Sequence, residues 1–252
     1  MGLEGRVALI TGGGRGIGAA IARGLAADGA DVAVNYRRDE TAAHDTVAAI
    51  ESLGRTARAY QASVDDADAD ARMMDAVLSD FGHIDILVNN AGIASRGNRV
   101  ADTDPAELER VWRTHAFGAF ILSQLVLPGM RDRPRGDIVM ISSVATSFMA
   151  AHSLPYNVAK ASLEALARTL AKEERASGIH VNTVAPGLVV SDMGRRLVKA
   201  TQGVEDIHDL DGRYPFGHVC TPEEVAEVVR FLVSERAGYL TDQRLTVDGG
   251  TF

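Results

Sequence analysis

A glycine-rich turn lies between the first apolar run of the chain and the first stretch with helical periodicity. The apolar run is Val7–Ile10, and the turn that follows reads Thr11-Gly12-Gly13-Gly14-Arg15-Gly16-Ile17-Gly18. After the turn, apolar residues recur at the three- and four-residue spacing of a helix. In such a strand-turn-helix unit, backbone N–H groups and the helix dipole favour an anionic phosphate. The stretch therefore predicts an α/β fold with a nucleotide site at its start.

Apolar runs and helical patterns alternate along the rest of the chain. Further strands are expected at 31–36, 55–62, 84–88, 137–142, 179–185 and 244–247. Helices are expected at 40–53, 66–81, 105–130, 156–177 and 222–234. Near-continuous apolar strands that alternate with helices form parallel sheets covered on both faces. We predict an α/β fold in which residues 1–252 form a single doubly wound Rossmann-type domain, with about seven parallel strands and helices on both faces.

The longest segment without a clear period is 187–216, which mixes charged residues and glycines with scattered apolar residues. Irregular segments of this length in compact domains usually carry function. We therefore expect a variable substrate loop here, acting as a lid.

Charge and cysteine content narrow the function. The chain has 26 Lys plus Arg against 34 Asp plus Glu, a net charge of -8, which disfavours nucleic acid and anionic membranes as partners. Its single cysteine, Cys220, excludes an intrachain disulfide and a cysteine-based zinc site, and no metal is expected. The first residues lack the apolar core of a signal peptide, so the sequence predicts a cytoplasmic protein.

Tyr156 and Lys160 are separated by three residues in a predicted helix. One helical turn places their side chains on the same face. A phenol titrates near pH ~10, so it exchanges protons near neutrality only if its phenolate is stabilised, as an adjacent fixed cation does. Taken alone, such a pair is far more often a surface tyrosine and a surface lysine that happen to lie one turn apart.

The strand at 31–36 ends without the carboxylate that usually binds the ribose hydroxyls of NAD. Two arginines, Arg37 and Arg38, follow the strand instead. Arg15 and Arg37 could hold a 2'-phosphate through charge-assisted hydrogen bonds. NADP(H) is therefore favoured as the cofactor and NAD(H) is the alternative. A solvated helix start explains Arg38 as well.

The motifs together resemble those of the short-chain dehydrogenase/reductase family. They are Gly12, Gly16 and Gly18, then Asn89-Asn90-Ala91-Gly92, and then Ser143 ahead of Tyr156-x-x-x-Lys160. The resemblance covers essentially the whole chain. It is strongest to the branch with 3-oxoacyl-acyl-carrier-protein reductases and bacterial polyol, sugar and alcohol dehydrogenases. It implies an oxidoreductase that interconverts a ketone and a secondary alcohol by hydride transfer with a nicotinamide cofactor.

The resemblance also implies a role for each catalytic candidate. Tyr156 would act as general acid in carbonyl reduction and as general base in alcohol oxidation. Lys160 would lower the pKa of that phenol and bind the nicotinamide ribose. Ser143 would hydrogen-bond the carbonyl oxygen of the substrate.

Cofactor contacts follow from the same resemblance. Asn90, Ala91 and Gly92 would form the floor beneath the adenosine ribose, and Ser63, where an acid is common, would lie near the adenine. Val189 and Ser191 would meet the nicotinamide carboxamide. The full set of implied cofactor-binding residues is Gly12, Arg15, Gly16, Ile17, Gly18, Arg37, Ser63, Val64, Asn90, Ala91, Gly92, Tyr156, Lys160, Pro186, Gly187, Val189 and Ser191.

Besides Ser63, two positions depart from the family pattern. His115 stands where the family carries a catalytic Asn that supports a helix irregularity and a proton relay. Three interpretations are open: a His ring nitrogen holds the same geometry, His115 itself titrates near neutral pH, or the relay is impaired. Asp242 replaces a common Gly ahead of the last strand and must form that turn in another way.

The substrate is less constrained by the sequence. Candidate lining residues are Ala94, Arg96, Ala145 and His152. A 3-oxoacyl thioester, delivered by an acidic acyl carrier protein, competes with sugar, polyol or cyclic-alcohol substrates. A catalytically silent nucleotide-binding regulator is the alternative from a different class. By resemblance, the chain is expected to form a homotetramer or a homodimer.

Overall fold

The structure is a computed structural model that describes residues 2–251, so residues 1 and 252 of the predicted domain lie outside it. Within the described range, seven parallel strands form one sheet in the order β3-β2-β1-β4-β5-β6-β7. The strands are β1 (Val7–Ile10), β2 (Asp31–Tyr36), β3 (Ala57–Gln61), β4 (Ile86–Asn89), β5 (Gly136–Ile141), β6 (Ile179–Pro186) and β7 (Arg244–Val247). The predicted doubly wound Rossmann-type sheet is confirmed.

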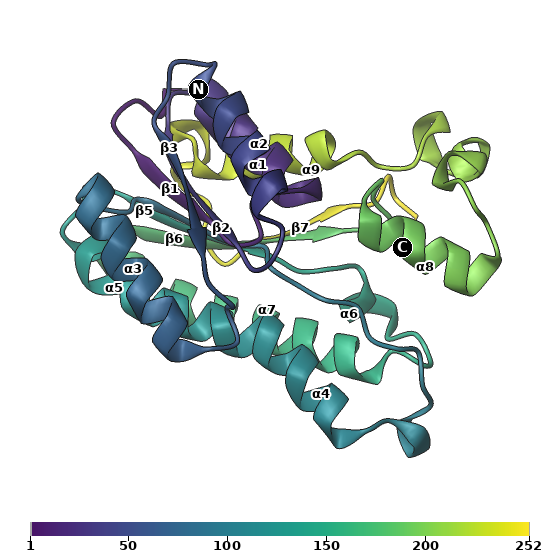
Figure 1. Ribbon diagram of the computed structural model, residues 1–252. Helices are drawn as coiled ribbons and strands as arrows, with labels where there is room; N and C mark the ends of the chain where they lie inside the picture. Colours follow the sequence, from purple (N-terminus) through teal and green to yellow (C-terminus); the bar gives the residue numbers. More distant parts are fainter. Residues whose placement is uncertain (1, 252) are drawn as a thin grey trace.

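Helices cover both faces of the sheet. Figure 1 shows α1, α2 and α9 on one face and α3, α4, α5 and α7 on the other. The helices are α1 (Gly16–Ala27), α2 (Glu40–Glu51), α3 (Ala67–Phe81), α4 (Pro105–Trp112), α5 (Gly118–Arg131), α6 (Ala145–Phe148), α7 (Leu154–Glu174), α8 (Asp192–Gln202) and α9 (Pro222–Val233). The short turns are one π-helical turn, Arg113–Phe117, and 3-10 turns at Val100–Asp102, Arg175–Ser177, Ile207–Arg213, Pro215–Gly217 and Glu235–Ala237.

The central strands contribute alternate residues to two hydrophobic cores because successive side chains of a strand point to opposite faces. In β1, Ala8 and Ile10 join the core beneath α1, α2 and α9, whereas Leu9 joins the core beneath α3, α5 and α7. This two-sided burial explains the near-continuous apolar runs of the sequence.

The strand order reverses between β1 and β4, which are neighbours in the sheet although β2 and β3 lie between them in sequence. Open α/β sheets bind ligands in the crevice outside the carboxyl ends of the strands at such a switch point. The glycine turn after β1 and the Asn90-Ala91-Gly92 segment after β4 both lie at this edge.

The segment at 187–216 is not irregular, which corrects the sequence-based expectation. It contains α8, which follows Ser191 and is capped at its other end by Gly203. The Ser191 side chain caps the first turn by accepting a hydrogen bond from Gly194 N. Val198 of α8 forms a small hydrophobic core with Ile207, Leu210 and Val219, which follow the helix in sequence. α8 lies outside the carboxyl edge of the sheet, beyond the end of β6 (Figure 1).

Asp242 forms its turn in the left-handed conformation, with φ of 58°. Its N–H donates to Val181 O at 2.9 Å, and the neighbouring Thr241 hydroxyl accepts from Val181 N at 3.1 Å. Asp242 thus forms the turn that Gly usually forms, although the left-handed conformation is unfavourable for a residue with a side chain.

Candidate active site

Hydrogen bonds to Asn35 of β2 hold the glycine turn in place. Gly12 N donates to the Asn35 side-chain oxygen at 3.2 Å, and Gly13 N donates to Asn35 O at 2.9 Å. A Cβ added to Gly18 would lie 2.3 Å from Gly12 O, so this position accepts only glycine. Asn35 was not identified from the sequence as a supporting residue, although a buried amide in an apolar strand was a usable signal.

A second set of hydrogen bonds ties the turn to the segment after β4. Thr11 Oγ1 accepts from Asn90 N and from Ala91 N, each at 2.9 Å. The Asn90 amide donates to Thr11 O at 2.8 Å and to Gly12 O at 3.2 Å. Asn90 therefore joins the two walls of the crevice, which is a structural role in addition to the implied contact with a ribose.

The close packing of the glycine turn and the start of α1 leave backbone groups available to an anionic group. The turn approaches its neighbours so closely that a Cβ on Gly12 would meet Ala91 Cα at 3.2 Å. Helix α1 begins at Gly16, so its positive end and its first N–H groups face the same edge. Both features suit the close approach of an anionic pyrophosphate.

The two arginines proposed for a 2'-phosphate lie near that edge. Arg15 Nη1 is 3.0 Å from Asp192 Oδ2, at the start of α8, and 4.0 Å from Asp39 Oδ2. Arg37 is exposed just after β2. Both guanidinium groups are thus accessible, and Arg15 is engaged in an exposed ion pair of the kind that stabilises a fold little.

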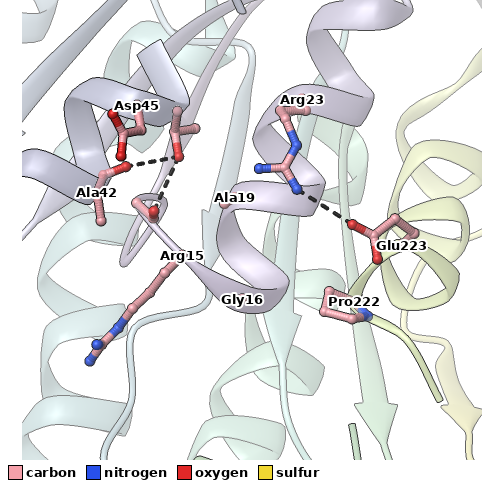
Figure 2. Close-up of a pocket in the computed structure, with 10 residues that line it drawn as sticks. Arg15, Gly16, Ala19, Arg23, Ala42, Asp45, Pro222 and Glu223 are labelled. Atoms are coloured by element: carbon pink, nitrogen blue, oxygen red, sulfur yellow. Dashed lines mark hydrogen bonds and ion pairs between the residues drawn. The ribbon is translucent and has the colours of Figure 1, made fainter. Parts of the chain in front are cut away.

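A cavity of about 280 Å³ lies behind the turn, between α1, α2 and the start of α9. Arg23 donates to Glu223 across it at 3.4 Å, while the Arg15 side chain points away from this pair (Figure 2). None of the four catalytic candidates lines it. The catalytic candidates lie at the carboxyl edge of the sheet and not around this cavity.

The four catalytic candidates come together from three elements. Ser143 follows β5, Tyr156 and Lys160 lie on the first turns of α7, and His115 lies in the π turn between α4 and α5. Ser143 hydrogen-bonds Tyr156. The Tyr156 ring centroid is 5.3 Å from the His115 ring and 5.7 Å from Lys160 Nζ.

The electrostatics of this group differ from the expectation in one respect. Burial raises the pKa of Tyr156, and the hydrogen bond with Ser143 opposes that effect only in part. Burial also lowers the pKa of Lys160 to about 7, and its Nζ donates to Ile141 O at 2.6 Å. In the protein alone, the net shift of the Tyr156 pKa is therefore upward and opposite to the expected lowering, because desolvation outweighs the hydrogen bond with Ser143.

His115 holds the backbone after β4. Its Nε2 lies 3.0 Å from Ile93 N and 2.8 Å from Ile93 O, and a Cβ added to Gly92 would lie 2.3 Å from the ring. Burial, with the Lys160 charge as a second cause, lowers the His115 pKa to about 3. Of the three interpretations, these contacts favour a ring nitrogen that holds the geometry, and the pKa argues against titration near neutral pH.

The residues expected near the nicotinamide lie beside the start of α8. Pro186 O accepts from Val144 N at 3.0 Å, which joins the end of β6 to the Ser143 loop. Val189 is buried, and Ser191 caps α8. A Cβ added to Gly16 would lie 3.7 Å from Ser191 Cβ, so the glycine turn and the α8 segment are in contact range.

At the predicted adenine end, Ser63 Oγ donates to Asp65 Oδ1 at 2.5 Å. The sequence reading named Ser63 and missed Asp65, whose carboxylate stands two residues beyond the position where an acid is common. Val64 is buried, and its carbonyl lies 2.1 Å from where a Cβ of Gly118 would be.

The four predicted substrate-lining residues differ in how exposed they are to solvent. Ala145 is buried, and its N–H donates to Ser143 Oγ at 3.2 Å, so it belongs to the catalytic group. Ala94 and Arg96 are exposed on the segment after β4, where Glu107 Oε1 accepts from Arg96 N at 2.6 Å. His152 is exposed, with φ of 64°, in the turn that precedes α7.

Two searches of residues 2–251 bear on other functions. None of the helices there has the length and apolar character to cross a membrane. Among the same residues, no three His, Cys, Asp or Glu side chains are grouped as metal ligands would be.

Comparisons with known proteins agree with this geometry. The family described as "Enoyl-(Acyl carrier protein) reductase" matches residues 12–251. A 3-oxoacyl-[acyl-carrier-protein] reductase of Synechocystis sp. is 38% identical over 249 residues, which are 98% of this chain and 97% of the relative.

Two solved structures are similar over nearly the whole chain. A short chain dehydrogenase from Burkholderia cenocepacia in complex with NADP is 36% identical, with a TM-score of 0.88 and 98% of each chain covered. A 7α-hydroxysteroid dehydrogenase complexed with NADH and 7-oxo glycochenodeoxycholic acid is 32% identical, with a TM-score of 0.90, covering 99% of this chain and 95% of that one.

Proposed function

The chain belongs to the short-chain dehydrogenase/reductase family, and we propose that residues 1–252 form one oxidoreductase domain that interconverts a ketone and a secondary alcohol. The observation that carries the proposal is the grouping of Ser143, Tyr156 and Lys160 at the carboxyl edge of the sheet, beside the glycine turn.

Each side chain has one task in this proposal. A nicotinamide supplies or accepts the hydride. The Tyr156 hydroxyl gives its proton to the carbonyl oxygen during reduction and takes it back during oxidation. The Ser143 hydroxyl, which hydrogen-bonds Tyr156 in the protein alone, turns its single proton to the same substrate oxygen.

Lys160 and His115 support the phenol. A protonated Lys160 next to Tyr156 stabilises the phenolate that forms after proton transfer. His115 stays neutral and fixes the Ile93 backbone, which keeps the π turn and its carbonyls in position for a proton relay.

NADP(H) is the proposed cofactor because Arg15 and Arg37 supply cations where NAD sites carry an acid. The similar structures include one complex with NADP and one with NADH, so the choice rests on this chain's own residues. We expect Arg37→Asp to lower kcat/KM with NADPH about 10- to 100-fold, because it replaces a charge-assisted hydrogen bond with repulsion. Steady-state kinetics with both cofactors measures the change.

Arg38→Asp is the matched control for that experiment, because Arg38 is exposed next to Arg37 and carries the same charge. It should change the NADPH to NADH ratio by less than about threefold. Equal turnover of NADH and NADPH by the native protein, together with no effect of Arg37→Asp, would refute the cofactor assignment.

His115→Asn tests whether the ring is a support or a titrating group. Either side chain can bond the Ile93 backbone, so we expect kcat to stay within about threefold and the pH profile to keep its shape. Loss of one limb of the profile would show that His115 titrates. A large gain in turnover would show that the native relay is impaired.

The finer assignments extend the same proposal. A 3-oxoacyl thioester is the leading substrate class, in keeping with the acyl-carrier-protein reductase among the relatives, and an acyl carrier protein is then the partner. Sugar, polyol and cyclic-alcohol substrates are the alternatives. We further propose a cytoplasmic homotetramer or homodimer, whose mass light scattering would measure.

A panel of ketones and alcohols with both cofactors tests the function as a whole. Acetoacetyl-CoA, a cyclic ketone and a ketose should be included, and we expect at least one to drive NADPH oxidation. If the protein binds NADPH while no ketone or alcohol reacts at any pH, it is a nucleotide-binding regulator and the proposal is wrong.

A further inference from the structure

An ion pair lies one helical turn beyond Lys160, outside the group of catalytic candidates. Glu164 is on α7, and Arg244 opens β7, 80 residues further along the chain. Arg244 Nε donates to Glu164 Oε1 at 3.0 Å, and both side chains are largely covered, with 30% and 18% of their surface exposed. A partly buried pair that connects an active-site helix to an edge strand needs an explanation beyond surface charge.

The Glu164 carboxylate reaches both sides of Ser143. Its Oε1 accepts from Ser142 Oγ at 2.6 Å and is 2.8 Å from Thr146 Oγ1. The Thr146 hydroxyl is also 2.9 Å from Ser143 O, and its single proton serves one acceptor at a time. Three donor atoms thus lie within hydrogen-bond distance of Glu164 Oε1, and two of them, in Ser142 and Thr146, flank Ser143 in sequence.

Arg244 also contacts the same loop, through a second nitrogen of its guanidinium group. Nη2 lies 3.3 Å from Ser143 O and 3.1 Å from Ser147 Oγ. The same nitrogen donates to Thr146 Oγ1 at 3.0 Å. The planar fork of an arginine suits this double engagement, whereas a lysine offers a single point charge.

Glu164 also acts on Lys160 through its charge. Burial lowers the pKa of Lys160 to about 7, and the Glu164 carboxylate opposes this. The titratable groups facing Lys160 are Tyr156 and Glu164 on its own helix and His115 from the π turn, while Arg244 reaches Glu164 from β7. Since His115 remains neutral, Glu164 is the anion that favours the ammonium form.

We propose that Glu164 and Arg244 are positioning residues: together they fix the loop that carries Ser143, and the Glu164 carboxylate stands one helical turn from Lys160 on α7. The inference rests on the proposed function of Tyr156 and Lys160. Neither residue touches the reacting atoms, so both act through Ser143 and Lys160.

The test compares Glu164→Gln with Arg244→Met. Glutamine keeps an acceptor for Ser142 and Thr146 but removes the charge, so the pKa of Lys160 should fall by about one pH unit. Arg244→Met leaves Glu164 without its cation, so the pKa of Lys160 should rise. NMR of the Lys160 side chain in cofactor-free protein measures both shifts, and their opposite signs distinguish charge coupling from a structural role.

Turnover provides the second readout. Glu164→Gln should lower kcat about tenfold above pH ~8, where more of Lys160 is neutral, and the high-pH limb should move down by the same amount as the pKa. Arg244→Met should lower kcat about tenfold at all pH values through the displaced Ser143 loop, and Arg244→Lys should lie between.

Arg168→Gln is the matched control. Arg168 is one further turn along α7 and lies 3.7 Å from Asp242, in an ion pair more remote from Ser143. Its removal should leave the Lys160 pKa within about 0.3 pH units, because exposed charges are well screened.

The outcomes separate this inference from the proposed function. An unchanged Lys160 titration in both variants of an active enzyme overturns the positioning role. Opposite shifts in a protein that reduces no ketone keep the coupling and overturn the function instead.

Discussion

Tyr156→Phe should lower kcat for ketone reduction by about 10²- to 10⁴-fold while leaving NADPH binding nearly unchanged, because only the proton donor is lost. The phenol hydroxyl bonds Ser143, and the ring, which phenylalanine keeps, packs against His115 at 5.3 Å. Packing and fold should therefore survive. Steady-state kinetics and a fluorescence titration with NADPH measure the two effects separately.

Tyr239→Phe is the control, since Tyr239 is fully exposed at the surface. It loses the same hydroxyl and should retain native turnover. Wild-type activity in Tyr156→Phe would exclude Tyr156 as the acid and would favour the regulator among the alternatives.

The second large effect concerns stability. Asp70 lies in the first turn of α3, completely buried, and neither carboxylate oxygen has a hydrogen-bond partner within residues 2–251. Burial raises the pKa of Asp70 to about 7, and the charges of Asp66 and Asp65 add to the effect. Such a carboxyl is tolerated when protonated and is costly when ionised.

The sign of the pH dependence follows. The native pKa of Asp70 exceeds its ordinary value of 3.8. Below pH 3.8 the group therefore costs no free energy of unfolding, and the free energy of unfolding falls as pH rises from there through about 7. We expect Asp70→Val to raise the free energy of unfolding by up to about 4 kcal/mol near pH 8, and by much less near pH 5. Urea unfolding at several pH values measures this difference.

Asp68→Val serves as the control because Asp68 is exposed in the same helical turn. Its effect should be about 1 kcal/mol or less, and unfavourable, since an acid in the first turn complements the helix dipole. A stability gain for Asp70→Val that does not depend on pH would contradict the account of Asp70 as a buried acid.

The fold could be predicted because the central strands are buried on both faces. Runs such as Val7–Ile10 and Gly136–Ile141 are entirely buried and stand out from the helices between them, and the glycine turn marks where the sheet begins. The motif residues Ser143, Tyr156 and Lys160 could be found because their chemistry depends on type and spacing.

Features that depend on contacts between residues far apart in the chain could not be predicted from the sequence. Helix α8 is mostly polar, and its apolar side wraps a small core completed by Leu210 and Val219, beyond the helix itself. The contact of Glu164 with Arg244 spans 80 residues. The pKa of Tyr156 depends on how completely the site excludes water, which spacing along a helix does not reveal.

The most direct test of the central claim is to follow the hydride. NADPH carrying deuterium at the reactive C4 position is mixed with the protein and the ketone that the panel identifies, and the product is analysed by mass spectrometry and NMR. We expect one deuterium on the carbinol carbon of the alcohol with native protein, and at least about 100-fold slower labelling with Tyr156→Phe. Alcohol without label, or equal rates for the two proteins, would contradict the claim that this chain transfers hydride with Tyr156 as its acid.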